Sequence, residues 1–273
     1  MSIESGGMLP GVESAVSAPP RLAVHRWGQG PRVVLVHGGV LGGREAWLAQ
    51  RPLTERWTLL APDRPGHGRS PAARQNFEPE AALVADQLLD EPSHLVGLSY
   101  GAIVAMFAAA ARPGSVRSLT VIEPPATSVA RGVPAVDAFG AAVRAVLEAS
   151  ELTPEQALRR FFPVAGVQVE LGDRVPEVLV RGMRQLQGAR PPDEAVLPLA
   201  QLRAAPFKIL VVSGAHSEAN EVICDTIADA TGAERAICPG AGHVVPNTGE
   251  PFNTLLENFL SGSLGGSLGG TDS

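Results

Sequence analysis

The sequence predicts an α/β fold with a mostly parallel, doubly wound sheet. Short apolar runs that suit buried strands alternate along the chain with segments that suit helices. Strands that alternate with helices form parallel sheets, because each right-handed crossover places a helix on one face. The chain has 273 residues, of which 45% are hydrophobic and 18% are charged, so a sizeable core can form.

Seven runs have the pattern of a strand. Residues 21–27 (RLAVHRW) suit an edge strand, whereas residues 32–38 (RVVLVHG) are apolar almost throughout, as expected of a strand that is buried on both faces. The other expected strands cover residues 57–63, 93–99, 116–123, 207–214 and 233–240. Helices are expected at residues 78–90, 100–112, 221–232 and 251–260.

Residues 124–206 interrupt this alternation, because they contain helix signals but no convincing strand. Thr153 and Gln156 have the spacing of a capping box at the start of one such helix. We expect the insertion to form a helical lid over the carboxyl edge of the sheet, where open α/β sheets bind ligands. Four large apolar residues of the lid suit either a pocket or the core: Phe139, Phe161, Phe162 and Met183.

The two ends of the chain differ in composition from the rest. Residues 1–20 are rich in Gly, Ser and Pro and lack the pattern of a signal peptide, which suggests a flexible N-terminal arm. Residues 261–273 repeat a Gly-Ser-Leu unit typical of a flexible tail. The core is then expected to comprise residues 21–123 and 207–260.

Charge and cysteine content argue against several classes of function. The net charge is −6 and no Lys/Arg run occurs, so no nucleic-acid or membrane partner is expected. No apolar stretch reaches the ~20 residues of a membrane span, and we expect a cytoplasmic protein. Cys224 and Cys238 are too few for a disulfide framework or a metal site. The sequence carries no signal of the oligomeric state.

The strongest chemical motif is VGLSYG, in which Gly97, Ser99 and Gly101 form G-x-S-x-G. It lies directly after an expected strand and directly before an expected helix. In that setting the serine occupies a tight turn that exposes its hydroxyl group, and small residues on either side leave room for the turn. Ser99 is therefore the candidate nucleophile.

Two further segments complete a possible hydrolytic site. His243 follows the last expected strand in a Gly-rich loop (PGAGHVVP), where it would accept the proton of Ser99. The loop VHGGVLGG could supply the backbone N–H of Gly39 to an oxyanion, and Tyr100 could supply the second. This loop does not match the nucleotide-binding glycine motifs, so we expect no cofactor.

These motifs together resemble the α/β-hydrolase superfamily. VLVHGG, LLAPDRPGHGRS, HLVGLSYGA and PGAGHVVP carry the resemblance, which spans about residues 21–260. It implies an eight-stranded sheet, a helical lid inserted after strand 6 that sets substrate choice, and a serine hydrolase mechanism without metal. Asp63, Arg64 and His67 would shape a loop near the sheet rather than take part in catalysis.

The acid of the triad departs from the family pattern. Its usual position in the loop after residues 207–214 is Ser217, which cannot replace a carboxylate. Glu218, one residue further, could substitute, or the enzyme could work without an acid. We favour Glu123, because it ends the strand next to the nucleophile and parallel strands lie about 4.8 Å apart. In this respect the chain is similar to the zearalenone lactone hydrolases.

The expected function is cleavage of a small-molecule carboxylic ester or lactone through an acyl-enzyme, with Ser99, His243 and Glu123 as the triad. The alternatives are a cofactor-free perhydrolase or haloperoxidase, a C–C bond hydrolase, or a ligand-binding protein on a hydrolase fold. Intact Ser99 and His243 argue against the last of these.

Overall fold

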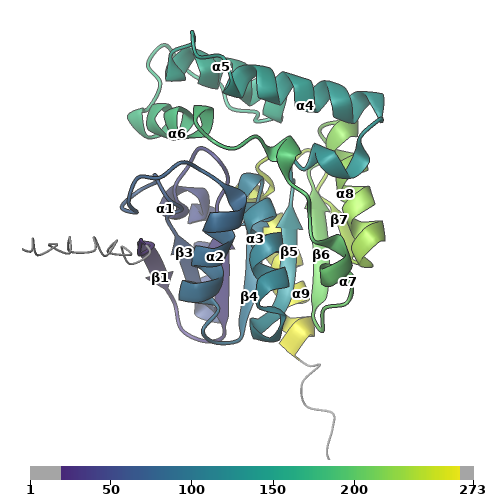
Figure 1. The fold of residues 1–273 in the computed structure, drawn as a ribbon. Coiled ribbons are helices and arrows are strands. Elements are labelled where there is room, and N and C mark those ends of the chain that lie inside the picture. Colours follow the sequence, from purple (N-terminus) through teal and green to yellow (C-terminus); the bar gives the residue numbers. More distant parts are fainter. Residues whose placement is uncertain (1–19, 265–273) are drawn as a thin grey trace, which may run out of the picture.

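The computed structural model describes residues 20–264, which form a central sheet with helices on both faces (Figure 1). The sheet has seven strands in the spatial order β1-β3-β2-β4-β5-β6-β7. Their bounds are Val24–Trp27 (β1), Arg32–Val36 (β2), Thr58–Pro62 (β3), Ser93–Leu98 (β4), Val116–Ile122 (β5), Lys208–Ser213 (β6) and Glu234–Ile237 (β7). Every strand that the apolar runs predict is therefore present.

The sheet is parallel except at one edge. β1 pairs antiparallel with β3, as suits an edge strand, and all other neighbouring strands pair in parallel. The expected count of eight strands is not met, since residues 20–264 contain seven, and the helical insertion follows β5. The eighth strand is implied only by the resemblance to the family, whereas residues 21–260 contain seven apolar runs.

Helices cover both faces of the sheet and its carboxyl edge. The α-helices are Gly43–Ala46 (α1), Phe77–Leu88 (α2), Tyr100–Ala111 (α3), Pro134–Leu147 (α4), Pro154–Ala165 (α5), Glu177–Gln187 (α6), Leu199–Arg203 (α7), Glu218–Thr231 (α8) and Glu250–Leu264 (α9). Short 3-10 helices cover Leu48–Glu55 (η1), Pro113–Ser115 (η2), Thr127–Ala130 (η3), Pro192–Glu194 (η4) and Val245–Thr248 (η5).

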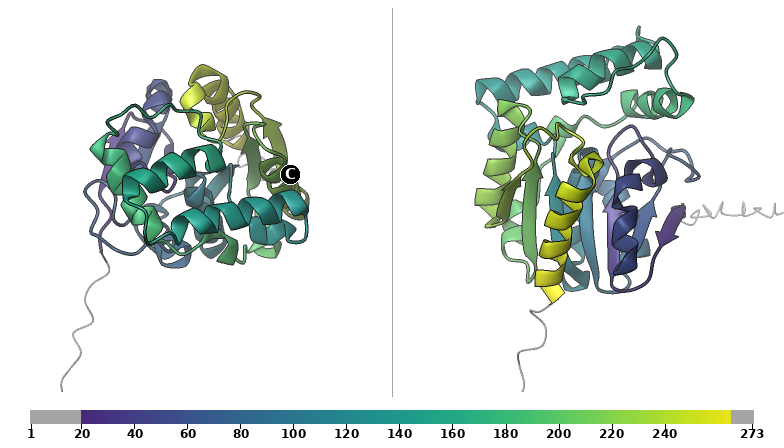
Figure 2. Two further views of the ribbon diagram at one scale, coloured as in Figure 1. Left: turned by 90° about the horizontal axis from the view of Figure 1, so that it is seen from above. Right: turned by 180° about the vertical axis from the view of Figure 1, so that it is seen from behind.

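The core has two apolar layers because side chains alternate between the faces of each strand. In β2, Val34 and Val36 pack with residues of α2, α3 and α8, whereas Val33 and Leu35 pack on the opposite face with residues of α1, η1 and α9. Figure 2 shows α9 on the face of the sheet opposite to α3. Both faces are thus buried, and this fixes the carboxyl ends of the central strands in place.

The insertion forms a roof of three helices, α4, α5 and α6, above the carboxyl edge of the sheet (Figures 1 and 2). The capping box at the start of α5 is present: Gln156 N donates to Thr153 Oγ1 at 3.3 Å, and Thr153 N donates to Gln156 Oε1 at 3.0 Å. The last part of residues 124–206 does not belong to this roof, because α7 packs against α3 and α8 beside the sheet.

The C-terminal boundary also differs from expectation. α9 continues to Leu264, so the first four residues of the segment assigned to a Gly/Ser tail, 261–264, are helical. The rest of that segment, and all but the last residue of the expected N-terminal arm, lie outside the described residues. Among residues 20–264 no helix combines the length and the apolar character needed to cross a membrane.

Candidate active site

Ser99 occupies a strained turn between β4 and α3. Its backbone has φ 56° and ψ −125°, a region that residues with a side chain rarely adopt. The flanking glycines make the turn possible. A Cβ atom at Gly97 would lie 2.5 Å from the carbonyl oxygen of Gly101, and one at Gly101 would lie 2.2 Å from that of His37. The G-x-S-x-G spacing is therefore a steric requirement of this turn.

The hydroxyl group of Ser99 faces His243. Ser99 Oγ lies 2.8 Å from His243 Nε2, which is hydrogen-bonding distance, and the imidazole is buried. His243 lies in the loop between β7 and η5. Its backbone N–H donates to the lid residue Gly166 at 3.1 Å. Two residues that are far apart in the sequence thus meet at the carboxyl edge in the geometry of a nucleophile and its base.

Glu123 lies behind the histidine, directly after β5. Its side chain is fully buried and its backbone has φ 48°. Glu123 Oε2 is 3.4 Å from His243 Nδ1, on the side of the ring opposite to Ser99. The order Ser99–His243–Glu123 is the one expected from the sequence, and it places a carboxylate where it can orient the imidazole.

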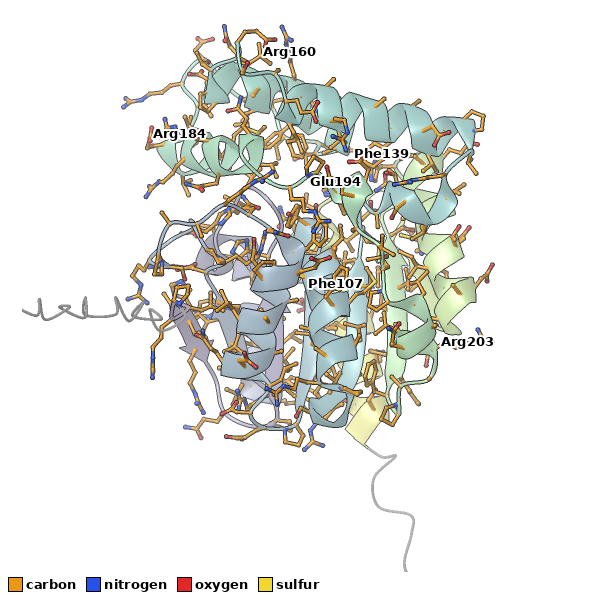
Figure 3. All side chains as sticks on the ribbon, viewed as in Figure 1. Phe107, Phe139, Arg160, Arg184, Glu194 and Arg203 are labelled. Carbon is orange, nitrogen blue, oxygen red and sulfur yellow. The ribbon has the colours of Figure 1, made fainter. Side chains whose placement is uncertain are left out.

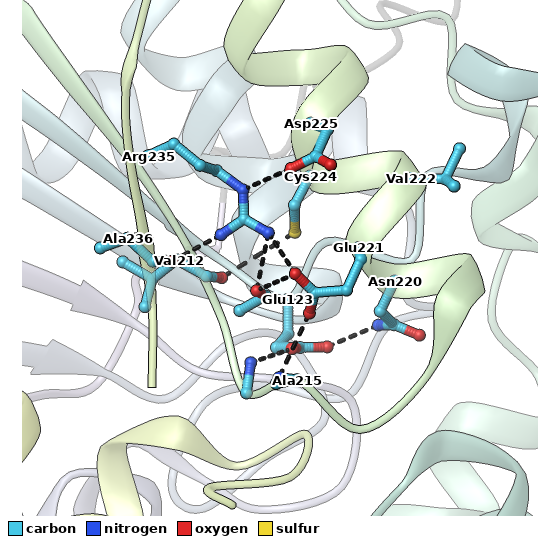
Figure 4. Close-up of polar contacts among 12 residues, drawn as sticks. Glu123, Val212, Ala215, Asn220, Glu221, Val222, Cys224, Asp225, Arg235 and Ala236 are labelled. Atoms are coloured by element: carbon cyan, nitrogen blue, oxygen red, sulfur yellow. Dashed lines mark hydrogen bonds and ion pairs between the residues drawn. The ribbon is translucent and has the colours of Figure 1, made fainter. Parts of the chain in front are cut away.

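Several donors hold the carboxylate of Glu123 in its charged form. Gly214 N donates to Oε1 at 2.6 Å, while Asn220 Nδ2 at 2.5 Å and His216 Nε2 at 2.9 Å contact Oε2 (Figure 4 draws the Asn220 contact). Burial alone would raise the pKa of this carboxyl, but the hydrogen bonds from His216, His243 and Gly214 outweigh it and lower the pKa to about 2. Glu123 is therefore ionised at neutral pH.

The loop after β6 holds the position that the family usually gives to the acid. Ser217 caps α8 there: its Oγ accepts from Asn220 N at 3.2 Å and donates to Asn220 Oδ1 at 2.9 Å. Glu218 is exposed in the first turn of α8. The structure therefore brings Glu123, and neither of these two residues, to the imidazole of His243.

Sequence reasoning missed the donors that this loop contributes. His216 and Asn220 bind the carboxylate, although our interpretation of the loop considered it only as a source of an acid. Their role depends on the strand order, since the pairing of β6 beside β5 brings the polar side chains of this loop within reach of Glu123. His216, His243 and Glu123 also lie close enough together to ligate a metal ion. The hydrogen bonds to Glu123 account for that proximity.

The loop after β2 lies close to Ser99. A Cβ atom at Gly38 would lie 3.3 Å from Ser99 Cβ, and Gly39 and Tyr100 line the same cavity as Ser99. Gly39 is also tightly enclosed, because a Cβ there would lie 2.8 Å from the side chain of Leu186 in the lid. The two residues expected to supply oxyanion donors therefore both border the nucleophile.

A buried ion pair fixes this loop. Arg64 Nη1 donates to the carbonyl oxygen of Gly38 at 2.8 Å, and Arg64 Nε pairs with Glu80 at 2.6 Å. His37 Nδ1 lies 2.8 Å from the same carbonyl, and His67 Nε2 lies 3.0 Å from that of Gly39. The carbonyl groups of both glycines thus accept hydrogen bonds from buried side chains. Arg64 and His67 therefore contact the backbone of the loop after β2.

A cavity of about 280 Å³ connects Ser99 with the lid. None of the described residues that line it is Asp, Glu, Lys or Arg. Its wall is mainly aliphatic and aromatic and includes Phe139, Phe161 and Phe162, whereas Met183 is buried in the core and does not line it. In Figure 3, Arg160 and Arg184 point away from the body of the molecule, whereas Phe139 lies on the side of the lid that faces the core. The lid thus presents an apolar surface to the nucleophile.

Comparisons with known proteins identify the family of this chain. A family model described as the alpha/beta hydrolase family matches residues 33–254. The chain is 36% identical over 185 residues to a pimeloyl-(acyl-carrier protein) methyl ester esterase of Methylococcus capsulatus, and the match covers 66% of this chain and 69% of that protein.

Solved structures share the fold over almost the whole chain. An esterase from Thermogutta terrifontis has a TM-score of 0.67 and 24% identity, covering 92% of this chain and 96% of that one. The N-acyl homoserine lactonase AidH has a TM-score of 0.69 and 19% identity, covering 92% and 95%. The family match extends from β2 to the start of α9 and includes every motif described above. The chain is therefore an enzyme of the alpha/beta hydrolase family.

Proposed function

We propose that this enzyme hydrolyses uncharged carboxylic esters or lactones through a covalent acyl-enzyme on Ser99. The observation that carries the proposal is the 2.8 Å contact between Ser99 Oγ and His243 Nε2 at a strained turn, beside a buried carboxylate. The relative from Methylococcus capsulatus is a methyl ester esterase, which supports an ester as the substrate.

In the first half of the reaction, Ser99 Oγ attacks the carbonyl carbon while His243 Nε2 accepts its proton. Negative charge then develops on the carbonyl oxygen, and the backbone N–H groups of Gly39 and Tyr100 stabilise it. The N-terminus of α3 adds a favourable field at the same point. Glu123 stabilises the imidazolium of His243, and His243 then returns the proton to the leaving alcohol.

In the second half, water attacks the acyl-enzyme. His243 Nε2 accepts a proton from this water molecule, and the same two N–H groups stabilise the second tetrahedral intermediate. Collapse of this intermediate releases the acid and restores the hydroxyl group of Ser99. In a lactone the alcohol remains attached to the acid, so a single hydroxy acid leaves the site.

The cavity limits the substrate by size and charge. An apolar cavity of about 150 Å³ holds one benzene molecule, so the 280 Å³ found here provide room for about a dozen carbon atoms. A charged group would be buried without a partner, which costs several kcal/mol. We therefore propose a medium-length apolar acyl chain, or a lactone of similar size, as the preferred substrate.

Hydrolysis of a series of p-nitrophenyl esters tests this proposal. The kcat/KM for the hexanoyl or octanoyl ester should exceed those for the acetyl and palmitoyl esters. A half-ester of the same length that ends in a carboxylate should react at least about tenfold more slowly. Ser99→Ala should lower kcat by about 10⁶ and abolish labelling by a fluorophosphonate. If Ser99→Ala kept more than a tenth of the wild-type rate, the proposed mechanism would be wrong.

A further inference from the structure

The carboxylate of Glu123 has more donors than the triad requires. Three donors meet at Oε2, namely Asn220 Nδ2 at 2.5 Å, His216 Nε2 at 2.9 Å and His243 Nδ1 at 3.4 Å. A carboxylate has about four acceptor positions on its two oxygens, so three donors on one oxygen crowd it. The contact of His216 is within normal hydrogen-bonding distance, whereas that of His243 is longer. The ring of His216 thus makes a shorter and stronger hydrogen bond to Glu123 than the ring of His243 does.

The same ring touches the lid. Gly166 ends α5 in the left-handed conformation (φ 72°), and a Cβ atom there would lie only 2.0 Å from His216 Nδ1. The carbonyl oxygen of Gly166 accepts the backbone N–H of His243. The rings of His216 and His243 meet edge to face, with centroids 5.9 Å apart. One lid residue therefore contacts the ring of one histidine and the backbone of the other.

Glycines allow the loop after β6, the loop that carries His243 and the end of α5 to pack closely. A Cβ atom at Gly214 would lie 1.9 Å from the carbonyl oxygen of Gly242, and one at Gly242 would lie 2.9 Å from that of Gly166. The loop after β6, the loop that carries His243 and the end of α5 are thus in backbone contact. A displacement of the lid at Gly166 would be transmitted to both histidines.

We propose that His216 is a positioning residue that links the lid to the acid of the triad. It holds the carboxylate of Glu123 through Nε2, and it is itself held in place by Gly166. When the lid packs against the core, it therefore fixes the carboxylate of Glu123 and also encloses the substrate. This inference rests on the proposed function, because it assigns Glu123 to orient His243 during acyl transfer.

Most of the groups that could change the charge around His216 are paired with a partner or neutral. From α8 and β7, Glu221 and Arg235 pair with each other at 2.6 Å (Figure 4), so their charges compensate. Burial and the nearby Glu123 raise the pKa of the Cys224 thiol of α8, which therefore stays neutral. From the loop after β5, the carboxylate of Glu123 faces His216. From the lid, Gly166 contributes backbone alone.

The first test compares His216→Ala with His216→Gln, whose amide can donate from the position of Nε2. We expect His216→Ala to lower kcat about tenfold with KM changed less than twofold. The acid limb of the profile of kcat/KM against pH should move about half a unit to higher pH, because one donor that competes with His243 for the carboxylate is then removed. His216→Gln should restore kcat to within about threefold of wild type. The proposal would be overturned if His216→Ala had the kcat of wild type, or if the kcat of His216→Gln were as low as that of His216→Ala.

The second test places a methyl group on the lid. Gly166→Ala should lower kcat at least about threefold, since its Cβ would displace the ring of His216. Gly132→Ala is the matched control: that lid glycine also has a positive φ (88°), but nothing lies within 4 Å of its Cβ position. It suffers comparable backbone strain and should keep wild-type kcat. In a His216→Ala background, the effect of Gly166→Ala should largely vanish.

The outcomes separate this inference from the proposed function. A Gly166→Ala effect that persists in full in the absence of the His216 ring would refute the link through His216. If Ser99 is required for turnover but the His216 and Gly166 variants match wild type, only the inference about the lid fails. If Ser99→Ala turns over esters normally, the proposed function itself fails.

Discussion

The loops that follow β5 and β6 lie side by side at the carboxyl edge of the sheet, yet they contribute opposite chemistry. The loop after β5 begins with Glu123, a buried carboxylate in a strained backbone conformation. The loop after β6 contributes only donors to that carboxylate: the N–H of Gly214, the ring of His216 and the amide of Asn220. One loop thus supplies the charge, and the other supplies the groups that stabilise it.

The difference shows how the acid of a triad can be placed after either of two neighbouring strands of the same fold. Residues at the carboxyl ends of neighbouring parallel strands face the same space, so a carboxylate on either strand can reach one imidazole. Once Glu123 takes this position, an acid at Ser217 would place a second negative charge nearby. A capping serine avoids that repulsion and lets Asn220 turn its amide toward Glu123.

Among changes in these two loops, the largest expected effect comes from removing the charge after β5. Glu123→Gln keeps the size of the side chain but loses the charge that stabilises the imidazolium, and kcat should fall by about 10⁴. Glu218→Gln is the matched control, since it neutralises an exposed carboxylate at the start of α8, directly after the neighbouring loop. It should stay within about tenfold of wild type on the same ester. Reversed results for this pair would assign the acid to the loop after β6.

Much of this site could be predicted because local sequence determines it. The turn at Ser99 requires the glycines around it, and the strand that ends directly before Glu123 is rich in β-branched and apolar residues. The donors to the carboxylate could not be predicted in the same way. His216 and Asn220 acquire their role only when β6 pairs beside β5, which is a property of the strand order.

The lid shows the same limit. Its helices follow from capping signals and apolar periodicity, and the capping box at Thr153 is formed as predicted. Which apolar side chains face the cavity depends on how the helices rotate against the core. Phe161 lines the cavity, but Met183 is buried among core residues. No periodicity in the sequence distinguishes these two environments.

The buried imidazoles and the carboxylate of Glu123 should affect the free energy of unfolding over different ranges of pH. Burial, as the largest cause, lowers the pKa of His67 and of His94 to about 4, so folding excludes protons that the unfolded chain binds below about 6.5. Each should cost about 3 kcal/mol of stability as pH falls from 6.5 to 4. The pKa of Glu123 is also lowered, but over a lower pH range: its contribution to stability is complete above its ordinary pKa of 4.5 and is lost as pH falls toward 2.

Denaturant unfolding at several pH values measures this difference. Between pH 4.5 and 6.5, the free energy of unfolding of Glu123→Gln should have the same slope against pH as wild type. His94→Gln should have a shallower slope, because one buried imidazole is removed. A slope that flattened in Glu123→Gln would mean that the carboxylate titrates in this range and that the donors around it are weaker than their distances indicate.

A smaller effect is expected from the amide donor. Asn220→Ala removes a hydrogen bond to a buried charge, and such bonds contribute about 1.5–3 kcal/mol. The free energy of unfolding should fall by that amount, and kcat should fall about tenfold because Glu123 loses one of its anchors. Val222→Ala, a partly buried position on the same helix, controls for a general loss of packing in α8. If both variants had the same kcat, the amide would serve stability alone.

The smallest effect is expected at the position that usually carries the acid. Ser217→Ala removes the N-cap of α8, which typically costs about 1 kcal/mol of stability. Thr153→Ala removes a similar cap from α5 in the lid and should cost about as much. Ser217 contacts Asn220, which in turn contacts Glu123, so kcat should fall less than about tenfold for Ser217→Ala and not at all for Thr153→Ala. A fall of about a hundredfold or more for Ser217→Ala would mean that the loop after β6 does more for the imidazole of His243 than hold the carboxylate of Glu123.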